Sequence, residues 1–265
     1  MTARAGIGVA AVVAAVAGTG LAPAPAPRPA APSAATSSST APTPVHHDGT
    51  APLLQLAAAV QRAPLPAGDA WLIRRSEYFQ NPPYVSYDLY TDTGKYYWSQ
   101  TESGLPAALA SGADASLGAD ATLAAAAAEA AGGDVAGAVQ RLLTWAGPNL
   151  PPTEADNRVW VTCTTSLPSV AYSPTLRAGV LRILAQLPGV QVTRTRTAGQ
   201  PTLSLTAGPQ EFGGLALQED FVIDATTGMP VADLQGKPGG RLALVTSYQV
   251  SRVTLAAVAA GRVGS

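Results

Sequence analysis

The stretch SPTLRAGVLRILAQLPGV, residues 173–190, separates a mainly helical part of the chain from a β-type part. Ser173 is a good helix N-cap, and Pro174 suits the first helical position, where a missing N–H costs nothing. The pair Pro188-Gly189 is a strong stop signal. Apolar residues recur between these signals at helical spacing, at Leu176, Val180, Ile183, Leu184 and Leu187. The stretch therefore predicts one amphipathic helix, with polar residues such as Arg177 outside its apolar stripe.

The sequence after this helix is typical of a strand meander. Turns that contain glycine join five β-type segments, which are Val190–Ala198, Thr202–Ala207, Leu215–Ile223, Met229–Gln235 and Arg241–Leu255. The first segment has no clear apolar face because Arg194 and Arg196 share a side with Val192, and this predicts an edge strand. The last segment places Leu244 and Tyr248 on one side, which favours a more central strand.

The sequence before the helix contains both helical and β-type periodicity. We expect a short helix at Leu53–Ala63, β-type segments at Trp71–Phe79, Tyr84–Thr91 and Lys95–Thr101, and a turn at Asp92-Thr93-Gly94. Residues 104–147 are helical and rich in alanine, and their few bulky side chains predict light packing. The segment Glu154–Ser166 is ambiguous, because its valines and threonines favour a strand whereas the spacing of Val159 and Cys163 allows a helix.

Strands and helices are segregated along the chain, and this favours an antiparallel sheet with helices on one side. We therefore predict an α+β fold. The predicted divisions are a signal peptide or membrane anchor at residues 1–22, a disordered linker at 23–52, and a single α+β domain at 53–265.

The amino-terminal segment has the features of a targeting sequence. Gly6–Ala22 carries no charge and follows Arg4. As a helix it would span roughly 25 Å, against ~30 Å for the hydrocarbon core of a bilayer. The small residues Ala15-Val16-Ala17 suit signal-peptide cleavage before Gly18. An uncleaved membrane anchor explains the same pattern, and a cytosolic protein with an alanine-rich tail is a third interpretation. The leading expectation is a domain outside the cell membrane, either anchored or secreted.

The predicted linker consists mainly of Pro, Ala, Ser and Thr, which do not form a packed core. The Ser/Thr cluster at 37–43 is compatible with O-glycosylation of a secreted protein. His46-His47 lies in the same tract without other ligands at metal-binding spacing, so we interpret it as solvated linker.

Composition and missing motifs exclude several classes of function. Lys+Arg 16 and Asp+Glu 17 are balanced, and no basic run offers a footprint for nucleic acid. Both histidines lie in the linker, which removes Ser-His and Cys-His catalysis and most zinc sites. Cys163 is the only cysteine, and we interpret it as a small buried apolar residue. We predict no enzyme activity, no catalytic residue, no metal and no cofactor.

Carboxylates are the one exception to this lack of catalytic residue types. Four of them are close in sequence, at Glu219, Asp220, Asp224 and Asp233. A glycosidase-like carboxylate pair is the only catalytic arrangement that these residues could support. Acids at strand ends are usually solvated, and this is the interpretation that we favour.

Aromatic residues crowd into Tyr78–Trp98. The register of the hairpin in this region is open by one residue. We prefer the register that gathers apolar residues on one face, namely Val85, Tyr87, Leu89, Tyr96 and Trp98, because a shared apolar face fixes pairing. Tyr87, Tyr96 and Trp98 are then the candidate ligand-binding residues. The alternative, which we favour, is that tyrosines simply suit half-buried strands.

Two segments carry a resemblance to known proteins. YSPTLRAGVLRILAQLPGV at 172–190 and FVIDATTGMPV at 221–231 resemble actinobacterial extracytoplasmic proteins of unknown function, often encoded beside sigma factors. The resemblance covers roughly residues 53–258 and implies a single amino-terminal anchor and a helix at Glu154–Ser166. Members usually have a longer segment before the anchor than the five residues found here.

The turn D-x-x-T-G-x-P at 224–230 is also similar to one in periplasmic lipoprotein-carrier and sigma-regulator sensor domains. This second resemblance implies a curved antiparallel sheet that cups helices around an apolar cavity. Asp224 can cap such a turn, Gly228 can adopt a left-handed conformation, and Pro230 suits an edge position.

Three hypotheses follow. The first is a non-enzymatic envelope domain that binds an apolar small molecule, a lipid or an envelope protein, within sigma-factor-linked signalling, with a cavity under the central helix. The second is a secreted structural or interaction protein with a filled core and no ligand pocket. The third is a carboxylate-dependent hydrolase, which requires two acids in one cleft.

Overall fold

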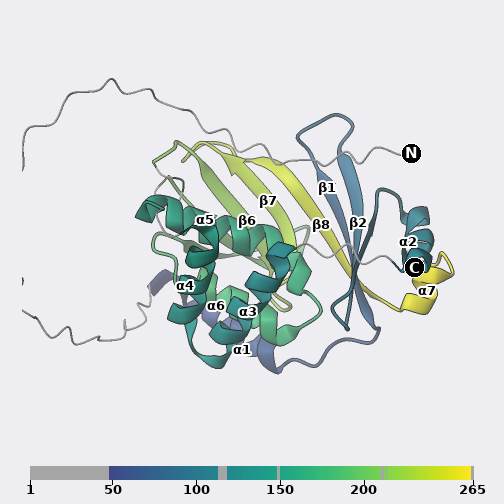
Figure 1. The fold of residues 1–265 in the computed structure, drawn as a ribbon. Coiled ribbons are helices and arrows are strands. Elements are labelled where there is room, and N and C mark those ends of the chain that lie inside the picture. Colours follow the sequence, from purple (N-terminus) through teal and green to yellow (C-terminus); the bar gives the residue numbers. More distant parts are fainter. Residues whose placement is uncertain (1–47, 113–117, 148–149, 210–211, 213, 264–265) are drawn as a thin grey trace, which may run out of the picture. The chain divides into compact units, whose positions relative to one another are not determined.

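An eight-stranded antiparallel sheet in the order β3-β2-β1-β8-β7-β6-β5-β4 forms the scaffold of the protein (Figure 1). The computed structural model describes residues 48–112, 118–147, 150–209, 212 and 214–263, which belong to one compact unit. The strands are β1 Ala70–Glu77, β2 Tyr84–Thr91, β3 Tyr96–Ser99, β4 Gln191–Thr197, β5 Gln200–Ala207, β6 Gln218–Asp224, β7 Pro230–Gly236 and β8 Ala243–Val253. The sheet is open, with β3 and β4 at its two edges.

The α-helices are α1 Ala51–Arg62, α2 Leu105–Ser111, α3 Gly118–Gly132, α4 Val135–Ala146, α5 Pro152–Ser166, α6 Pro174–Leu184 and α7 Leu255–Ala259. Short 3₁₀ turns lie at Asp48–Thr50, Glu102–Gly104 and Leu167–Val170. The predicted mixed fold with an antiparallel sheet is confirmed. So are the edge position of β4, the central position of β8, and the helix over Glu154–Ser166.

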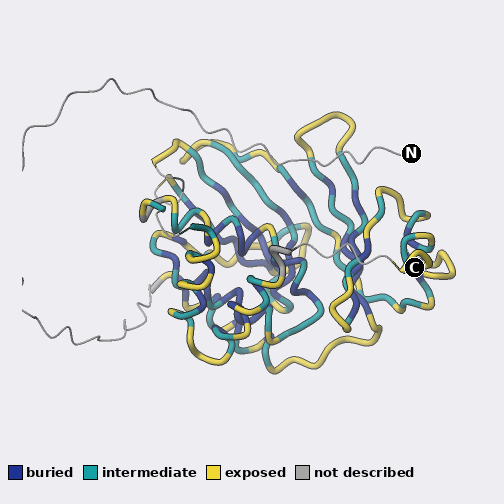
Figure 2. The backbone as a smooth tube through the Cα atoms, in the orientation of Figure 1, coloured by how far each residue is buried: buried dark blue, intermediate teal, exposed yellow. Residues whose placement is uncertain are grey.

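The sequence predicted that the helices pack on one side of the sheet, but the structure places helices on both faces. Helices α1, α3, α4, α5 and α6 lie together beside the sheet (Figure 1). They share one apolar core with side chains of β5 and β6, and the residues that form this core are buried (Figure 2). Helices α2 and α7 instead pack on Leu72, Leu89 and Tyr97. Leu72 lies between Trp71 and Ile73 in β1, and these two neighbours face the larger helical layer. The two small helices therefore cover the opposite face, at the β1–β3 end of the sheet.

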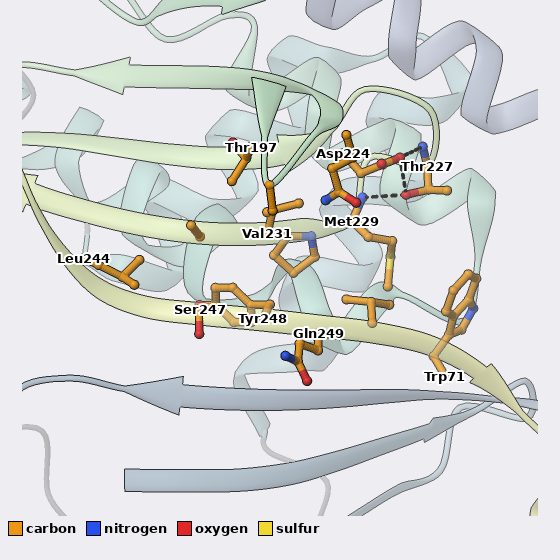
Figure 3. A pocket seen from close by; sticks show the side chains of 15 residues that line it. Trp71, Thr197, Asp224, Thr227, Met229, Val231, Leu244, Ser247, Tyr248 and Gln249 are labelled. Atoms are coloured by element: carbon orange, nitrogen blue, oxygen red, sulfur yellow. Dashed lines mark hydrogen bonds between the residues drawn. The ribbon is translucent and has the colours of Figure 1, made fainter. Parts of the chain in front are cut away.

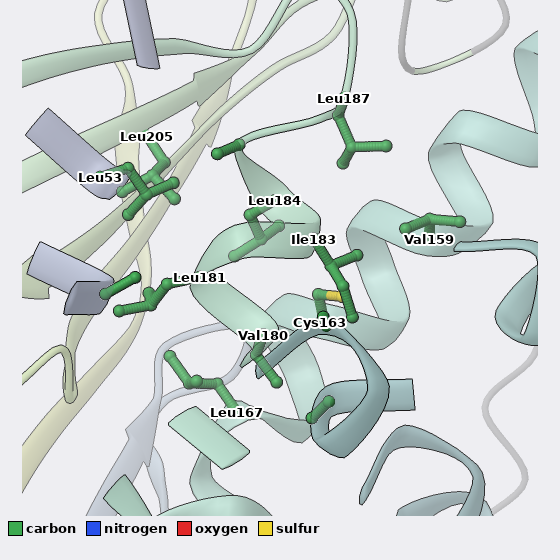
Figure 4. Close-up of a cluster of buried hydrophobic side chains, with 14 of the residues drawn as sticks. Leu53, Val159, Cys163, Leu167, Val180, Leu181, Ile183, Leu184, Leu187 and Leu205 are labelled. Atoms are coloured by element: carbon green, nitrogen blue, oxygen red, sulfur yellow. The ribbon is translucent and has the colours of Figure 1, made fainter. Parts of the chain in front are cut away.

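Helix α6 begins where the sequence predicted, but it ends earlier and its polar side is more buried than predicted. The Ser173 side chain accepts a hydrogen bond from the Leu176 amide, as an N-cap should. The helix ends at Leu184, before Pro188-Gly189. It is buried on most sides rather than on one stripe (Figure 4), and Arg177 retains only 4% of its exposure. Helices α1, α3, α4 and α5 pack around α6, so little of its surface faces solvent.

The alanine-rich region packs tightly, which corrects the expectation of light packing. The fully buried residues of α3 include Leu123, Ala126, Ala127 and Ala130. A Cβ placed on Gly179 of α6 would lie 1.9 Å from the Ala127 carbonyl oxygen, so the two backbones are almost in contact. Arg182 then donates to the carbonyl oxygens of Ala130 and Ala131, which lie in the last turn of α3. Small side chains thus allow a close helix crossing.

The amino-terminal predictions lie outside the described residues. These are the signal peptide or anchor at 1–22, the linker up to residue 47, and His46-His47. Within the described ranges, no helix combines the length and the apolar character needed to cross a bilayer.

Candidate functional site

The structure separates the three aromatic candidates. Leu89 pairs with Tyr97 and Tyr87 with Ser99, so the preferred register was wrong by one residue. Tyr87 lies on the face covered by α2, whereas Tyr96 and Trp98 lie on the opposite face. They therefore form no single aromatic platform. The sheet chose the other register because Tyr97, rather than Tyr96, fills the apolar cluster beneath α2.

Tyr96 and Trp98 have different environments. The Tyr96 hydroxyl donates to Asp88 Oδ1 at 2.7 Å, and its ring stacks on Tyr90 with centroids 4.8 Å apart. Trp98 is 44% exposed. Asp88 also accepts from Ser86, and Arg75 Nε lies 3.7 Å from Asp88 Oδ2. This polar cluster holds the tyrosines as structural residues of a half-buried sheet.

A cleft of about 590 Å³ opens between β7 and β8 (Figure 3). The ladder between these strands extends only from Ala232 to Gln235 on β7, and Ser247 is the last β8 residue that it pairs. Beyond Ser247, β8 continues along β1 without a ladder partner on its β7 side. The sheet therefore splays into two halves, and the cleft lies where they part.

Local sequence explains why the strands part here. Pro230 opens β7 and has no N–H to donate to a neighbouring strand. The preceding turn is closed by Asp224, whose Oδ1 accepts from the Thr226 and Thr227 amides. Gly228 has a φ of +68°, as predicted for this turn. The turn thus fixes Met229 and the start of β7 as one wall of the cleft.

The lining of the cleft is mainly apolar. It includes the side chains of Trp71, Met229, Val231, Leu244 and Val250. Ser247 and Gln249 add a hydroxyl and an amide, so the site combines apolar walls with a few polar groups. That combination is characteristic of small-molecule sites. No sequence pattern pointed to it, because its walls come from β1, β7, β8 and two hairpin turns.

A second, smaller chamber of about 120 Å³ lies between α5 and strands β6–β8. Its lining includes Glu219 and Phe221 of β6, Asp233 and Gln235 of β7, Tyr248 of β8, and Thr164 and Thr165 of α5. Phe221 pairs with Asp233 and Glu219 with Gln235, so the two acids are diagonal neighbours on one face. The structure therefore brings together two of the four predicted carboxylates.

The other two carboxylates lie elsewhere. Asp220 accepts hydrogen bonds from Thr206 and Gln218, and Asp224 is used in the β6–β7 turn. Alternation along β6 places both on the face opposite Glu219. Sequence proximity alone could not decide which acids would meet.

Burial raises the pKa of both acids in the chamber. Glu219 is 6% exposed, and desolvation together with the charge of Asp233 raises its pKa to about 8. Desolvation raises the pKa of Asp233 to about 6, partly offset by a hydrogen bond from Gln235. Burial also raises the pKa of the Tyr248 phenol, which lines both the chamber and the cleft. The Glu219 carboxyl thus retains its proton at neutral pH.

Cys163 is buried in the main core, as the sequence predicted, and burial raises the pKa of its thiol. A thiol in such a place is a packing group.

Comparisons of the chain with known protein families, with curated proteins and with solved structures give no match.

Proposed function

We propose that this chain is an extracytoplasmic, non-enzymatic recognition domain that binds an apolar small molecule or lipid in the cleft between β7 and β8. The observation that supports the proposal is the cleft itself. Its volume of about 590 Å³ lies within the ~300–1,000 Å³ of typical ligand pockets. Its walls present the apolar surface that such a ligand would remove from water.

In this proposal, the antiparallel sheet is the curved scaffold of an envelope domain held on a Pro/Ala-rich linker. Residues 1–22 either anchor it in the cell membrane or direct its secretion. Sigma-factor-linked envelope signalling is the proposed context. The binding site differs from the cavity expected under the central helix, because Val180, Leu181 and Leu184 of α6 are fully buried in the core at that place.

Native mass spectrometry of the full chain, purified from its own cell envelope, tests the proposal. The expected result is an additional mass that organic solvent removes. Ser247→Leu, which places a larger side chain in the cleft, should reduce the bound fraction. Ser251→Leu is the matched control, because Ser251 lies on the same strand and face but outside the cleft lining. Spectra without any added mass in repeated preparations would contradict the proposal, and so would equal loss in both variants.

A carboxylate-dependent hydrolase is a second candidate, favoured by the convergence of Glu219 and Asp233 in one chamber. The two pKa values, raised to about 8 and about 6, would suit one proton donor and one proton acceptor at neutral pH. The chamber is, however, far smaller than a typical ligand pocket. Turnover of a glycoside that Asp233→Asn abolishes would support the hydrolase against the binding domain. The remaining hypothesis, an interaction protein without a ligand, predicts no bound mass and no turnover.

A further inference from the structure

Exposed apolar side chains gather at one end of the sheet. The turns 78–83 and 237–242 lie at this end, because β1 ends and β8 begins there (Figure 1). Phe79 in the first turn is 69% exposed. The other large apolar side chains exposed at this end are those of Tyr78, Leu244 and Leu215, the last of which precedes β6. Such a concentration is characteristic of an interaction surface.

The two turns form one continuous surface. The Tyr78 amide donates to the Val245 carbonyl oxygen at 2.8 Å, and the Tyr78 hydroxyl lies 3.2 Å from Ser247 Oγ. The first turn therefore begins beside the strand that follows the second. We call the exposed residues of 78–83 and 237–244 the tip surface. Leu244 also lines the apolar cleft, so the tip surface borders the cleft.

The charges on the tip surface are all positive. Lys237 and Arg241 are exposed, and among the described residues neither belongs to an ion pair. Neither segment of the tip surface contains an acidic residue. Glu77, the acid that precedes the first turn, pairs with Arg75. Unpaired cations beside exposed apolar side chains are complementary to the headgroups and acyl chains of an anionic bilayer.

The residue types of the first turn also suit the membrane interface. Pro82 and Pro83 have no backbone N–H, so the turn has fewer donors that would lose water on entering a bilayer. Tyr78 has the apolar ring and polar hydroxyl that suit the headgroup level, and Phe79 adds a fully apolar ring. A bilayer accepts such side chains without a matching shape, whereas a protein partner would need one.

We infer that the tip surface docks on a bilayer that contains anionic phospholipids. Phe79 enters the apolar part of the interface, and Lys237 and Arg241 contact the lipid phosphates. This interaction goes beyond ligand binding in the cleft. Docking would place the cleft beside the bilayer, because Leu244 belongs to both surfaces.

The test uses the full chain with an environment-sensitive fluorophore on one introduced cysteine. Gln80→Cys places the label in the first turn, and Ala67→Cys is the matched control, exposed just before β1 at the opposite end of the sheet. The native Cys163 is buried and therefore protected from the reagent. The vesicles contain equal amounts of phosphatidylcholine and phosphatidylglycerol.

The expected result is an emission shift to shorter wavelength, quenched by doxyl-labelled lipid, for the Gln80→Cys label alone. The predicted amino-terminal anchor is identical in both labelled chains, so binding through it cannot produce a difference between them. The ratio of inserted to free label then measures docking in further variants of the Gln80→Cys chain.

Phe79→Ser should lower this ratio about tenfold, since it removes a large apolar side chain from the interface. Leu65→Ser is the matched control, because Leu65 is exposed at the opposite end of the sheet. Lys237→Gln should lower the ratio about fivefold. Lys95→Gln is its control, in the turn between β2 and β3 at the opposite end. Both controls should stay within about twofold of the parent chain.

Three outcomes would overturn the inference. The first is an equal or absent shift at the two label positions, and the second is the same response with phosphatidylcholine alone. The third is an unchanged ratio in either Phe79→Ser or Lys237→Gln. The signal requires no ligand in the cleft, so the result is independent of the cleft proposal.

Discussion

Gly179→Ala is the most direct test of how the helical layer is built. The added methyl group would lie 1.9 Å from the Ala127 carbonyl oxygen, whereas ordinary contacts begin at 3.4 Å. To restore an ordinary contact, helices α6 and α3 would have to separate by about 1.5 Å. The atoms in the way belong to the α3 backbone, which cannot move aside as a flexible side chain could. Overpacking of this kind costs about 1–3 kcal/mol, and sometimes more.

The gain in helix propensity from glycine to alanine, about 1 kcal/mol, opposes this cost. Because the obstacle is backbone within a fully buried crossing, we place the cost at the upper end of its range. The net loss in the free energy of unfolding is then about 2 kcal/mol. For a domain of this size, that corresponds to a fall in Tm of about 4–8 °C.

Thermal unfolding followed by circular dichroism measures the effect. Gly132→Ala is the matched control, since it lies at the end of α3 with no atom within 4 Å of the added methyl. It should leave stability unchanged or raise it by up to about 1 kcal/mol. If Gly179→Ala melted at the same temperature as Gly132→Ala, the close crossing of α3 and α6 would be wrong.

Three further predictions concern the pH dependence of stability, an ion pair and the thiol. Burial raises the pKa of Glu219 to about 8, above the value of 4.5 for an unperturbed glutamate. The stability that its protonated form contributes is therefore fully present below pH 4.5 and is lost as the pH rises through about 8. Thermal melts from pH 5 to 8.5 should show a falling Tm, and Glu219→Gln should flatten that fall. Arg252 donates hydrogen bonds of 2.7 and 2.6 Å to the Asp92 carboxylate and a third to the Gly68 carbonyl oxygen. Arg252→Lys should therefore lower the free energy of unfolding in urea by about 2 kcal/mol. An unchanged urea midpoint would refute this role. Cys163 should resist iodoacetamide in the native state and react in guanidinium chloride, as mass spectrometry would show; rapid native labelling would mean that the core opens readily.

Local signals in the sequence determined most of the secondary structure. Ser173 and Pro174 start α6 as their capping chemistry requires, and the Asp224–Gly228 turn forms as its residue types predicted. The strand meander after α6 and the edge position of β4 also followed from composition and alternation. These features depend on hydrogen bonds and conformational preferences within a few residues, which is why they are visible in the sequence.

Tertiary structure decided the hairpin register, the burial of Arg177 and the tight packing of the alanine-rich helices. A shift of one residue turned Tyr96 away from Tyr87, because the Tyr97 ring belongs to the apolar cluster that α2 and the distant helix α7 cover. The diagonal placement of Glu219 and Asp233 on one face and the splaying of β7 from β8 likewise depend on which strands become neighbours. Each of these results reflects contacts between residues far apart in the chain, and such contacts leave no local pattern. The sequence by itself thus determined the elements, and packing between them determined both the cleft and the chamber.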